Sequence, residues 1–139
     1  MTVLLPPGWK PPIGYANGIV AASGRLVFIA GQVGWDAAQI FHSAELAPQF
    51  AQALENVLAV LAMAGGRAEH ICRMTVFCTD KPAYLAARAE LARVWRRLMG
   101  RHFPAMSMIF VAELLDSPGK VEIEATAVVP NEPPVNTPV

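Results

Sequence analysis

Residues 46–79 read LAPQFAQALENVLAVLAMAGGRAEHICRMTVFCT, and this stretch decides the fold because a helical pattern passes directly into a strand pattern. Apolar residues recur at the three-and-four spacing of one helical face from Leu46 to Leu61. Gly65 and Gly66 then predict the end of the helix, because glycine readily adopts the conformation that closes a last turn. Residues 70–79 alternate and are rich in Ile, Met, Val and Phe, which predicts a strand.

A second helix is expected over residues 80–99. Asp80 is a suitable N-cap, and Pro82 fits the first turn, where its missing N–H has no helical acceptor. The apolar positions after it follow helical spacing, and Gly100 marks the end. The two helices therefore flank a single strand in the middle of the chain.

The remaining strands are predicted on either side of this centre. Residues 19–22 and 26–30 are two short apolar runs separated by Ser-Gly-Arg, which predicts a β-hairpin. Residues 106–112 and 120–129 complete the order β-β-α-β-α-β-β. This order predicts an α+β fold in which two helices cover one face of one sheet. We expect one domain over residues 1–139, with a proline-rich N-terminal arm at about 1–13 and a C-terminal tail at about 131–139.

The composition narrows the possible partners. The 139 residues are 54% hydrophobic and only 16% charged, with a formal net charge of zero. The surplus of apolar side chains favours a buried interface between subunits. A neutral chain has no long-range field for phosphate backbones, so nucleic acid is not an expected partner. No apolar run is long enough to span a bilayer and no basic leader precedes one, so we expect a cytoplasmic protein.

Motifs with strict spacing, such as phosphate-binding glycine loops, zinc ligand pairs and nucleophile elbows, are missing from the sequence, so we expect neither cofactor nor metal. Cys72 and Cys78 are an even number of residues apart in one predicted strand, so their side chains are expected on the same face. We favour small buried hydrophobic residues over reactive thiols for both. His42, His70 and His102 stand apart from one another, and surface or boundary roles are favoured over chemical ones.

Two polar features need an explanation. Glu122 and Glu124 fall on one face of the last strand, either as a solvated side or with one carboxylate lining a pocket for acid–base work. Arg88 falls at or beside the apolar stripe of the second helix. It either extends to solvent along its aliphatic stem or binds an anion. The sequence leaves both pairs of alternatives open.

Five pieces of the chain, in order, resemble the RidA (YjgF) family. They are LVFIAGQ at residues 26–32, ALENV at 53–57, MTVFCTD at 74–80, PAMS at 104–107 and VEIEA at 121–125. The resemblance implies a chorismate-mutase-like fold that packs as a homotrimer with small-molecule clefts between subunits. It also implies cofactor-independent hydrolysis of reactive enamines and imines, such as 2-aminoacrylate, to a 2-keto acid and ammonia.

The resemblance assigns site residues position by position. The family's acid–base glutamate falls on Glu122. The ligand-binding positions fall on Tyr15, Ala30, Gly31, Arg88, Met106 and Met108. Met106 stands where the family has an arginine that clamps the substrate carboxylate, and losing such a pair removes roughly 2–5 kcal/mol of recognition. Our hypothesis is that Arg88 reaches the same cleft and compensates for this loss.

Three functions remain open from the sequence. The first is an enamine or imine deaminase with an altered substrate, in which Glu122 is the acid–base group. The second is a metabolite-binding or sensor protein without turnover, which the apolar Met106 favours. The third is an endoribonuclease or translation inhibitor, as some relatives are described, and it requires a basic groove built from Arg93, Arg96, Arg97 and Arg101.

Overall fold

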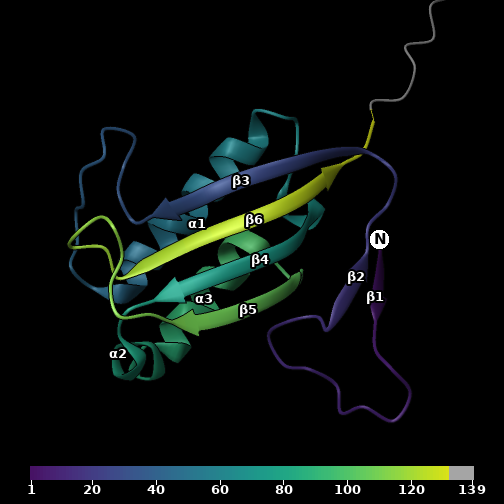
Figure 1. The fold of residues 1–139 in the computed structure, drawn as a ribbon, viewed down its shortest axis with the longest axis horizontal. Coiled ribbons are helices and arrows are strands. Elements are labelled where there is room, and N and C mark those ends of the chain that lie inside the picture. The colour runs from purple at the N-terminus through teal and green to yellow at the C-terminus, as the bar shows by residue number, and fades with distance from the viewer. Residues whose placement is uncertain (132–139) are drawn as a thin grey trace, which may run out of the picture.

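A four-stranded mixed sheet organises the computed structural model, which describes residues 1–131 (Figure 1). The strand order is β3 (Arg25–Val33), β6 (Val121–Val129), β4 (Ile71–Cys78) and β5 (Ala105–Phe110). β6 is antiparallel to both of its neighbours, and β4 and β5 are parallel. The last strand of the sequence therefore lies inside the sheet, between segments that are far apart along the chain.

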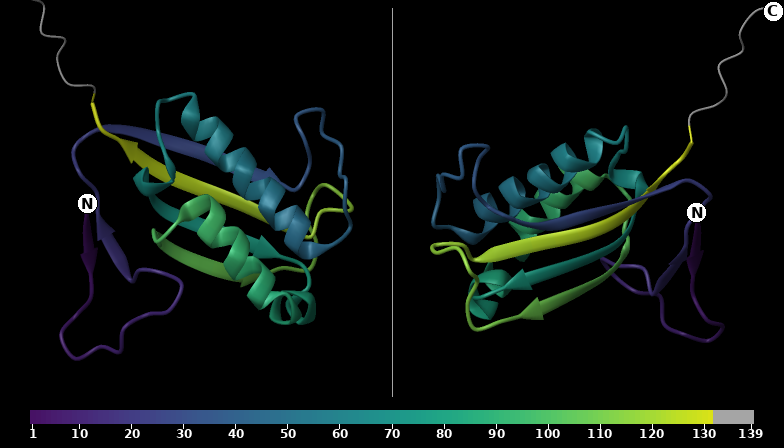
Figure 2. Two further views of the ribbon diagram at one scale, coloured as in Figure 1. Left: turned by 180° about the vertical axis from the view of Figure 1, so that it is seen from behind. Right: turned by 45° about the horizontal axis from the view of Figure 1, so that its top comes forward.

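Helices lie on one face of this sheet only (Figure 2). They are α1 (Leu46–Ala62), α2 (Lys81–Ala86) and α3 (Arg88–Met99), and the short 3-10 turn η1 (Ala68–His70) precedes β4. We call the side of the sheet under α1 and α3 the covered face and the opposite side the open face. The predicted α+β class, with one sheet and two main helices on one face, is confirmed.

Strand β6 shows why the two faces differ. Its buried residues alternate with partly or fully exposed ones, so Val121, Ile123 and Ala125 point to the covered face, and Glu122 and Glu124 point to the open face. Leu54 and Val57 of α1 pack into the same core as Ile123, and all three are fully buried. The sheet and α1 thus share one hydrophobic core.

The predicted hairpin between residues 19–22 and 26–30 is wrong. β2 (Gly18–Val20) pairs with β1 (Thr2–Leu4), antiparallel, as a separate two-stranded sheet beside the main one (Figure 1). Gly24 instead packs against the end of β6, because a Cβ there would overlap the carbonyl of Val129. The N-terminal arm expected at about residues 1–13 therefore contains β1, and its prolines lie in the loop that leads to β2.

The helix predicted over residues 80–99 is divided into α2 and α3. The backbone of Ala87 leaves the helical region at φ −94° and ψ 4°, and its N–H is directed at the carbonyls of both Ala83 and Tyr84. Such a shared bond is typical of a tightening last turn. Arg88 therefore begins α3, whereas the sequence placed it in the middle of a helix.

The two cysteines do not follow simple strand parity. The pairing of β4 with β6 shifts between Ile71 and Arg73, and Cys72 lies in this irregularity. One extra residue in a strand breaks the alternation on which the parity prediction rests. Cys78 is buried and Cys72 partly buried.

The C-terminal tail expected at about residues 131–139 lies, apart from its first residue, outside the described part of the chain. Within residues 1–131, no helix combines the length and the apolar character needed to cross a membrane.

Candidate functional site

A cavity of about 330 Å³ opens on the covered side of the sheet, between β5 and α3. Met106 and Met108 line it from β5, and Arg88 lines it from the first turn of α3. The two methionines share a side because they are two residues apart on one strand, in register with the buried Met74 and Val76. Three of the predicted ligand-binding residues are therefore brought together.

Aromatic rings form the far wall of this cavity, and the sequence analysis did not assign them to a site. Trp95 and Phe103 stack with ring centroids 5.7 Å apart and an interplanar angle of 5°. Gly100 ends α3 with φ 63°, so the chain turns back and returns Phe103 to the helix. The Trp95 Nε1–H donates to the carbonyl oxygen of His102 at 3.1 Å, which fixes the indole. The helical spacing of Trp95 from Leu91 indicates a core residue and gives no sign of a role in a site.

On the open face, Glu122 lies directly above Gly31. A Cβ built on Gly31 would overlap Oε1 of Glu122, so any other residue would displace the carboxylate from this position. The pairing of β3 with β6 shifts between Ile29 and Gln32, which places Ala30 and Gly31 in a bulge beside Glu122. These three predicted site residues therefore form a second group.

Tyr15 precedes a residue that pairs with the start of β5. The N–H of its neighbour Ala16 donates to the carbonyl oxygen of Pro104 at 3.0 Å, and Ala16 bridges to Ala105. Ile13 and Gly14, just before Tyr15, line the covered-side cavity. Tyr15 thus lies next to the group that contains Arg88, with a side chain that is 42% exposed.

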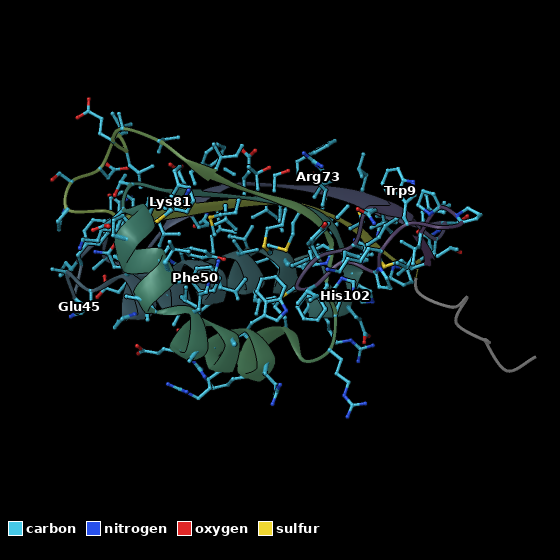
Figure 3. All side chains as sticks on the ribbon, turned by 90° about the horizontal axis from the view of Figure 1, so that it is seen from below. Trp9, Glu45, Phe50, Arg73, Lys81 and His102 are labelled. Atoms are coloured by element: carbon cyan, nitrogen blue, oxygen red, sulfur yellow. The ribbon has the colours of Figure 1, made fainter. Side chains whose placement is uncertain are left out.

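Within one chain, the structure does not bring Arg88 and Glu122 into a common cleft. Arg88 lines the cavity on the covered side, whereas Glu122 projects from the open face. Figure 3 shows the two sides of the sheet edge-on, with Phe50 on the side of the helices and Arg73 on the other side. The hypothesis that Arg88 replaces the clamp beside Glu122 of the same chain is therefore not supported, because the sheet lies between them.

The open face also has a hollow of about 460 Å³ that the sequence analysis missed. Arg73, Thr75 and Glu124 line it together with Phe28 and Ala30. Arg73 is a single basic residue in an otherwise apolar strand, and this pattern could have identified it. No ion pair of Arg73 occurs within residues 1–131, although Glu124 lines the same hollow.

The three histidines have structural roles. His42 Nε2 lies 2.6 Å from Oδ2 of Asp36, and this hydrogen bond is the largest cause of the lowered pKa of Asp36. His70 Nδ1 accepts the N–H of Arg67 at 2.9 Å, and His102 Nε2 lies 2.6 Å from the carbonyl oxygen of Ile71. In the described residues, no three or more His, Cys, Asp or Glu side chains gather as metal ligands do.

Burial raises the pKa of both thiols. Desolvation is the largest cause for Cys72 and for Cys78, and it disfavours the thiolate that would react. The Cys72 thiol donates to the carbonyl oxygen of Thr126 at 3.3 Å. This environment supports the structural interpretation of both residues.

The basic residues of α3 lie mainly outside the cavity. Arg93, Arg96 and Arg97 line a shallow hollow on the helix surface. Arg97 Nη1 lies 3.3 Å from Oε1 of Glu55, which neutralises part of this charge. Arg101 lies beyond the end of α3 and lines a second hollow with Arg96, so the four arginines border two separate hollows rather than one basic groove.

Comparison with known proteins identifies the family. The family described as endoribonuclease L-PSP matches residues 10–129. A RutC family protein from Haemophilus influenzae is 38% identical over 105 residues, covering 76% of this chain and 80% of that protein. Protein DfrA of Myxococcus xanthus is 32% identical over 119 residues, with 82% and 84% covered.

Solved structures agree with this match. A Rid family protein of unknown function, YyfB from Yersinia pestis, has a TM-score of 0.81 at 32% identity, covering 92% of this chain and 98% of that one. E. coli TdcF with bound serine has a TM-score of 0.64 at 30% identity, with 93% and 99% covered. The resemblance of the five sequence pieces is confirmed, and the chain belongs to the endoribonuclease L-PSP family, which is the RidA (YjgF) family of Rid and RutC proteins.

Proposed function

We propose that the chain is a cofactor-independent enamine or imine deaminase whose site forms between copies of a homotrimer. The observation that carries the proposal is the carboxylate of Glu122, which lies above the Gly31 backbone in the β3 bulge. A bulge beside a strand carboxylate is a common way to aim a side chain at a ligand. The serine bound to the relative TdcF supports a small ligand derived from an amino acid.

The reaction requires only proton transfers and water. An enamine accepts a proton at carbon to become an imine, water adds to the C=N carbon, and ammonia leaves as the carbonyl forms. Glu122 is the only predicted acid–base residue, and it transfers the protons in these steps. Neither oxidation nor reduction occurs, so the substrate and water balance the product and ammonia.

The single chain holds two groups of site residues that are each incomplete, which supports a site between two copies of the chain. The group on the open face has a carboxylate but no predicted anchor, and the covered-side cavity has Arg88 but no carboxylate. The open face also exposes large apolar side chains, since Leu26 is 57% and Phe28 75% exposed. Such an apolar surface favours self-association, which would bring the Arg88 half of one copy to the Glu122 half of another.

The test measures ammonia release from imines that an amino-acid oxidase generates in the same tube. Wild type is compared with Glu122→Gln, which keeps the shape of the side chain but removes its acid–base capacity. We expect release above the uncatalysed rate to fall on the order of a hundredfold or more, the usual contribution of one acid–base group.

Glu113→Gln is the matched control, because Glu113 is an exposed carboxylate in the loop between β5 and β6. It should leave the rate unchanged. Glu124→Gln decides which of the two strand carboxylates acts. Equal rates for wild type and Glu122→Gln would contradict the proposal, and so would a complete loss of rate in Glu124→Gln alone.

A second function, ligand binding without turnover, is favoured by Met106. An uncharged side chain in place of the family's arginine leaves the cavity largely apolar, which suits binding more than catalysis. Thermal shift against a metabolite panel tests it, because a ligand at about a hundred times its Kd stabilises the folded state by about 2.7 kcal/mol. Strong shifts without ammonia release would favour this function over the first.

A further inference from the structure

We infer that the covered-side cavity binds carboxylates with a bulky apolar or aromatic side chain, and that Arg88 holds the carboxylate. This inference rests on the proposed function and names its substrate class as imines derived from amino acids such as leucine or phenylalanine. It is argued from the walls, the size and the charge of the cavity.

The walls of the cavity are apolar on three sides. Met106 and Met108 form the floor on β5, Leu91 faces them from α3, and the stacked pair Trp95 and Phe103 closes one end. Methionine side chains adapt to the shape of a ligand and make favourable contacts with aromatic rings. Such walls favour an aryl or branched aliphatic group over the small polar group of a serine-like ligand.

The size of the cavity agrees with such a ligand. An engineered protein cavity of roughly 150 Å³ with Leu, Ile and Phe walls binds benzene. The cavity of about 330 Å³ therefore has room for a six-membered ring and a polar head group. An alanine-derived imine would leave much of the apolar wall in contact with water.

The charges at the cavity have one sign. Arg88 and Arg96 are its charged lining residues, and no Asp or Glu lines it. Neither arginine forms an ion pair within the part of the chain that the structure describes. A guanidinium group binds a carboxylate through two parallel hydrogen bonds, so an anionic head group is the natural ligand.

Arg88 is the better placed of the two arginines. It begins α3 directly after Ala87, the residue that caps the end of α2, so its side chain leaves the helix at the end of the cavity near Tyr84. Both arginines are exposed, but Arg96 also lines the two hollows on the outer surface of α3, whereas of these three hollows Arg88 lines only the cavity. The preference for Arg88 can be tested directly, because the two side chains occupy different turns of one helix.

The experiment is calorimetric titration with 3-phenylpropionate, which has a ring and a carboxylate but no reactive group. Propionate has the head group alone, and 3-phenylpropan-1-ol has the ring alone. We expect 3-phenylpropionate to bind on the order of tenfold more tightly than either, as one charge-assisted pair added to ring burial predicts. Equal affinity for 3-phenylpropionate and propionate would overturn the inference.

Arg88→Gln should weaken the binding of 3-phenylpropionate on the order of tenfold and leave the alcohol unaffected. Arg93→Gln is the matched control, since Arg93 lies on the same helix, is exposed and does not line the cavity. Equal affinities for these two variants, or a loss confined to Arg96→Gln, would reject Arg88 as the anchor. Circular dichroism of each variant verifies that it is folded.

Measurements of ammonia release distinguish a failure of this inference from a failure of the proposed function. If both hold, phenylalanine-derived imine releases ammonia faster than alanine-derived imine, and Glu122→Gln abolishes release without weakening 3-phenylpropionate binding. Tight binding with no release for any imine would contradict the proposed function alone. Release that is fastest for the alanine-derived imine, with no binding of 3-phenylpropionate, would contradict this inference alone.

Discussion

The two faces of the four-stranded sheet carry similar side chains in opposite environments. On the covered face, Ile123 and Met74 are fully buried under the helices, whereas on the open face Phe28 is 75% and Ile109 43% exposed. The covered face completes its core within one chain, and the open face does not. The core of the single chain therefore lies on one side of the sheet and the proposed association on the other, and the two candidate half-sites are divided in the same way.

The largest expected effect of a single change is on the covered face. Ile123→Ala removes a fully buried side chain from the centre of the core and should reduce the free energy of unfolding by about 2–5 kcal/mol. Urea denaturation monitored by circular dichroism measures this loss.

Phe28→Ala provides the comparison from the open face. In dilute protein it should change the unfolding free energy little, because the side chain is mostly exposed in the single chain. It should instead weaken association, measured by sedimentation velocity over a range of concentrations. A loss in Phe28→Ala at low concentration as large as that in Ile123→Ala would abolish the distinction between the faces.

The next effect concerns Gln49, a buried polar residue of α1 on the covered side. Its Nε2–H group donates to the carbonyl oxygens of Ser43 and Pro118, and its Oε1 accepts the N–H of Lys120 at 2.7 Å. Gln49→Met keeps the volume but leaves these groups without their partner, which should cost about 1–3 kcal/mol or more in thermal and urea unfolding.

Thr75→Val is the matched change on the open face. Thr75 is largely buried but lines the open-face hollow, and its hydroxyl is not a buried unpaired group, since the described residues contain none. Its replacement should alter stability by less than about 1 kcal/mol. If Thr75→Val were as destabilising as Gln49→Met, hydrogen bonding would not explain the difference.

Two glycines extend the comparison to the backbone. A Cβ on Gly34 would lie 2.7 Å from backbone atoms of Gln49, so Gly34→Ala must separate β3 from α1 at a cost of about 1–3 kcal/mol. A Cβ on Gly31 meets only the end of the Glu122 side chain, which can move. Gly31→Ala should therefore leave the melting temperature nearly unchanged but reduce ammonia release. Normal turnover in Gly31→Ala would indicate that the position of Glu122 is not important.

The smallest effect lies outside both faces, in the loop that contains Asp36 and His42. The hydrogen bond with His42 lowers the pKa of Asp36, and the N–H groups of Ala38 and Ile40 add to this. A carboxyl with a lowered folded-state pKa stabilises the fold above its ordinary pKa, and this contribution disappears as the pH falls through the lowered value. His42→Ala should raise the pKa of Asp36 in an NMR titration, and an unchanged pKa would contradict the assigned cause.

Much of the fold followed from sequence patterns whose causes are local. The spacing from Leu46 to Leu61 predicted α1, and the alternation after residue 120 predicted β6 with Glu122 and Glu124 on one face. The hairpin prediction failed because an apolar run does not specify its partner, and β2 pairs with β1 instead. The parity prediction for Cys72 failed because a bulge depends on the neighbouring strand.

The candidate site was predicted as a set of residues but not as an arrangement. The sequence by itself determined the residue types: a strand carboxylate at Glu122, an arginine near an apolar helical stripe, and a methionine where the family has its clamp. Only the tertiary structure decided that the sheet separates Arg88 from Glu122 and that Trp95 and Phe103 stack beside the methionines. The physical reason is that the periodicity of apolar residues shows only which face of one helix or strand is buried. A site requires several helices and strands to be placed relative to one another, and long-range packing determines that placement.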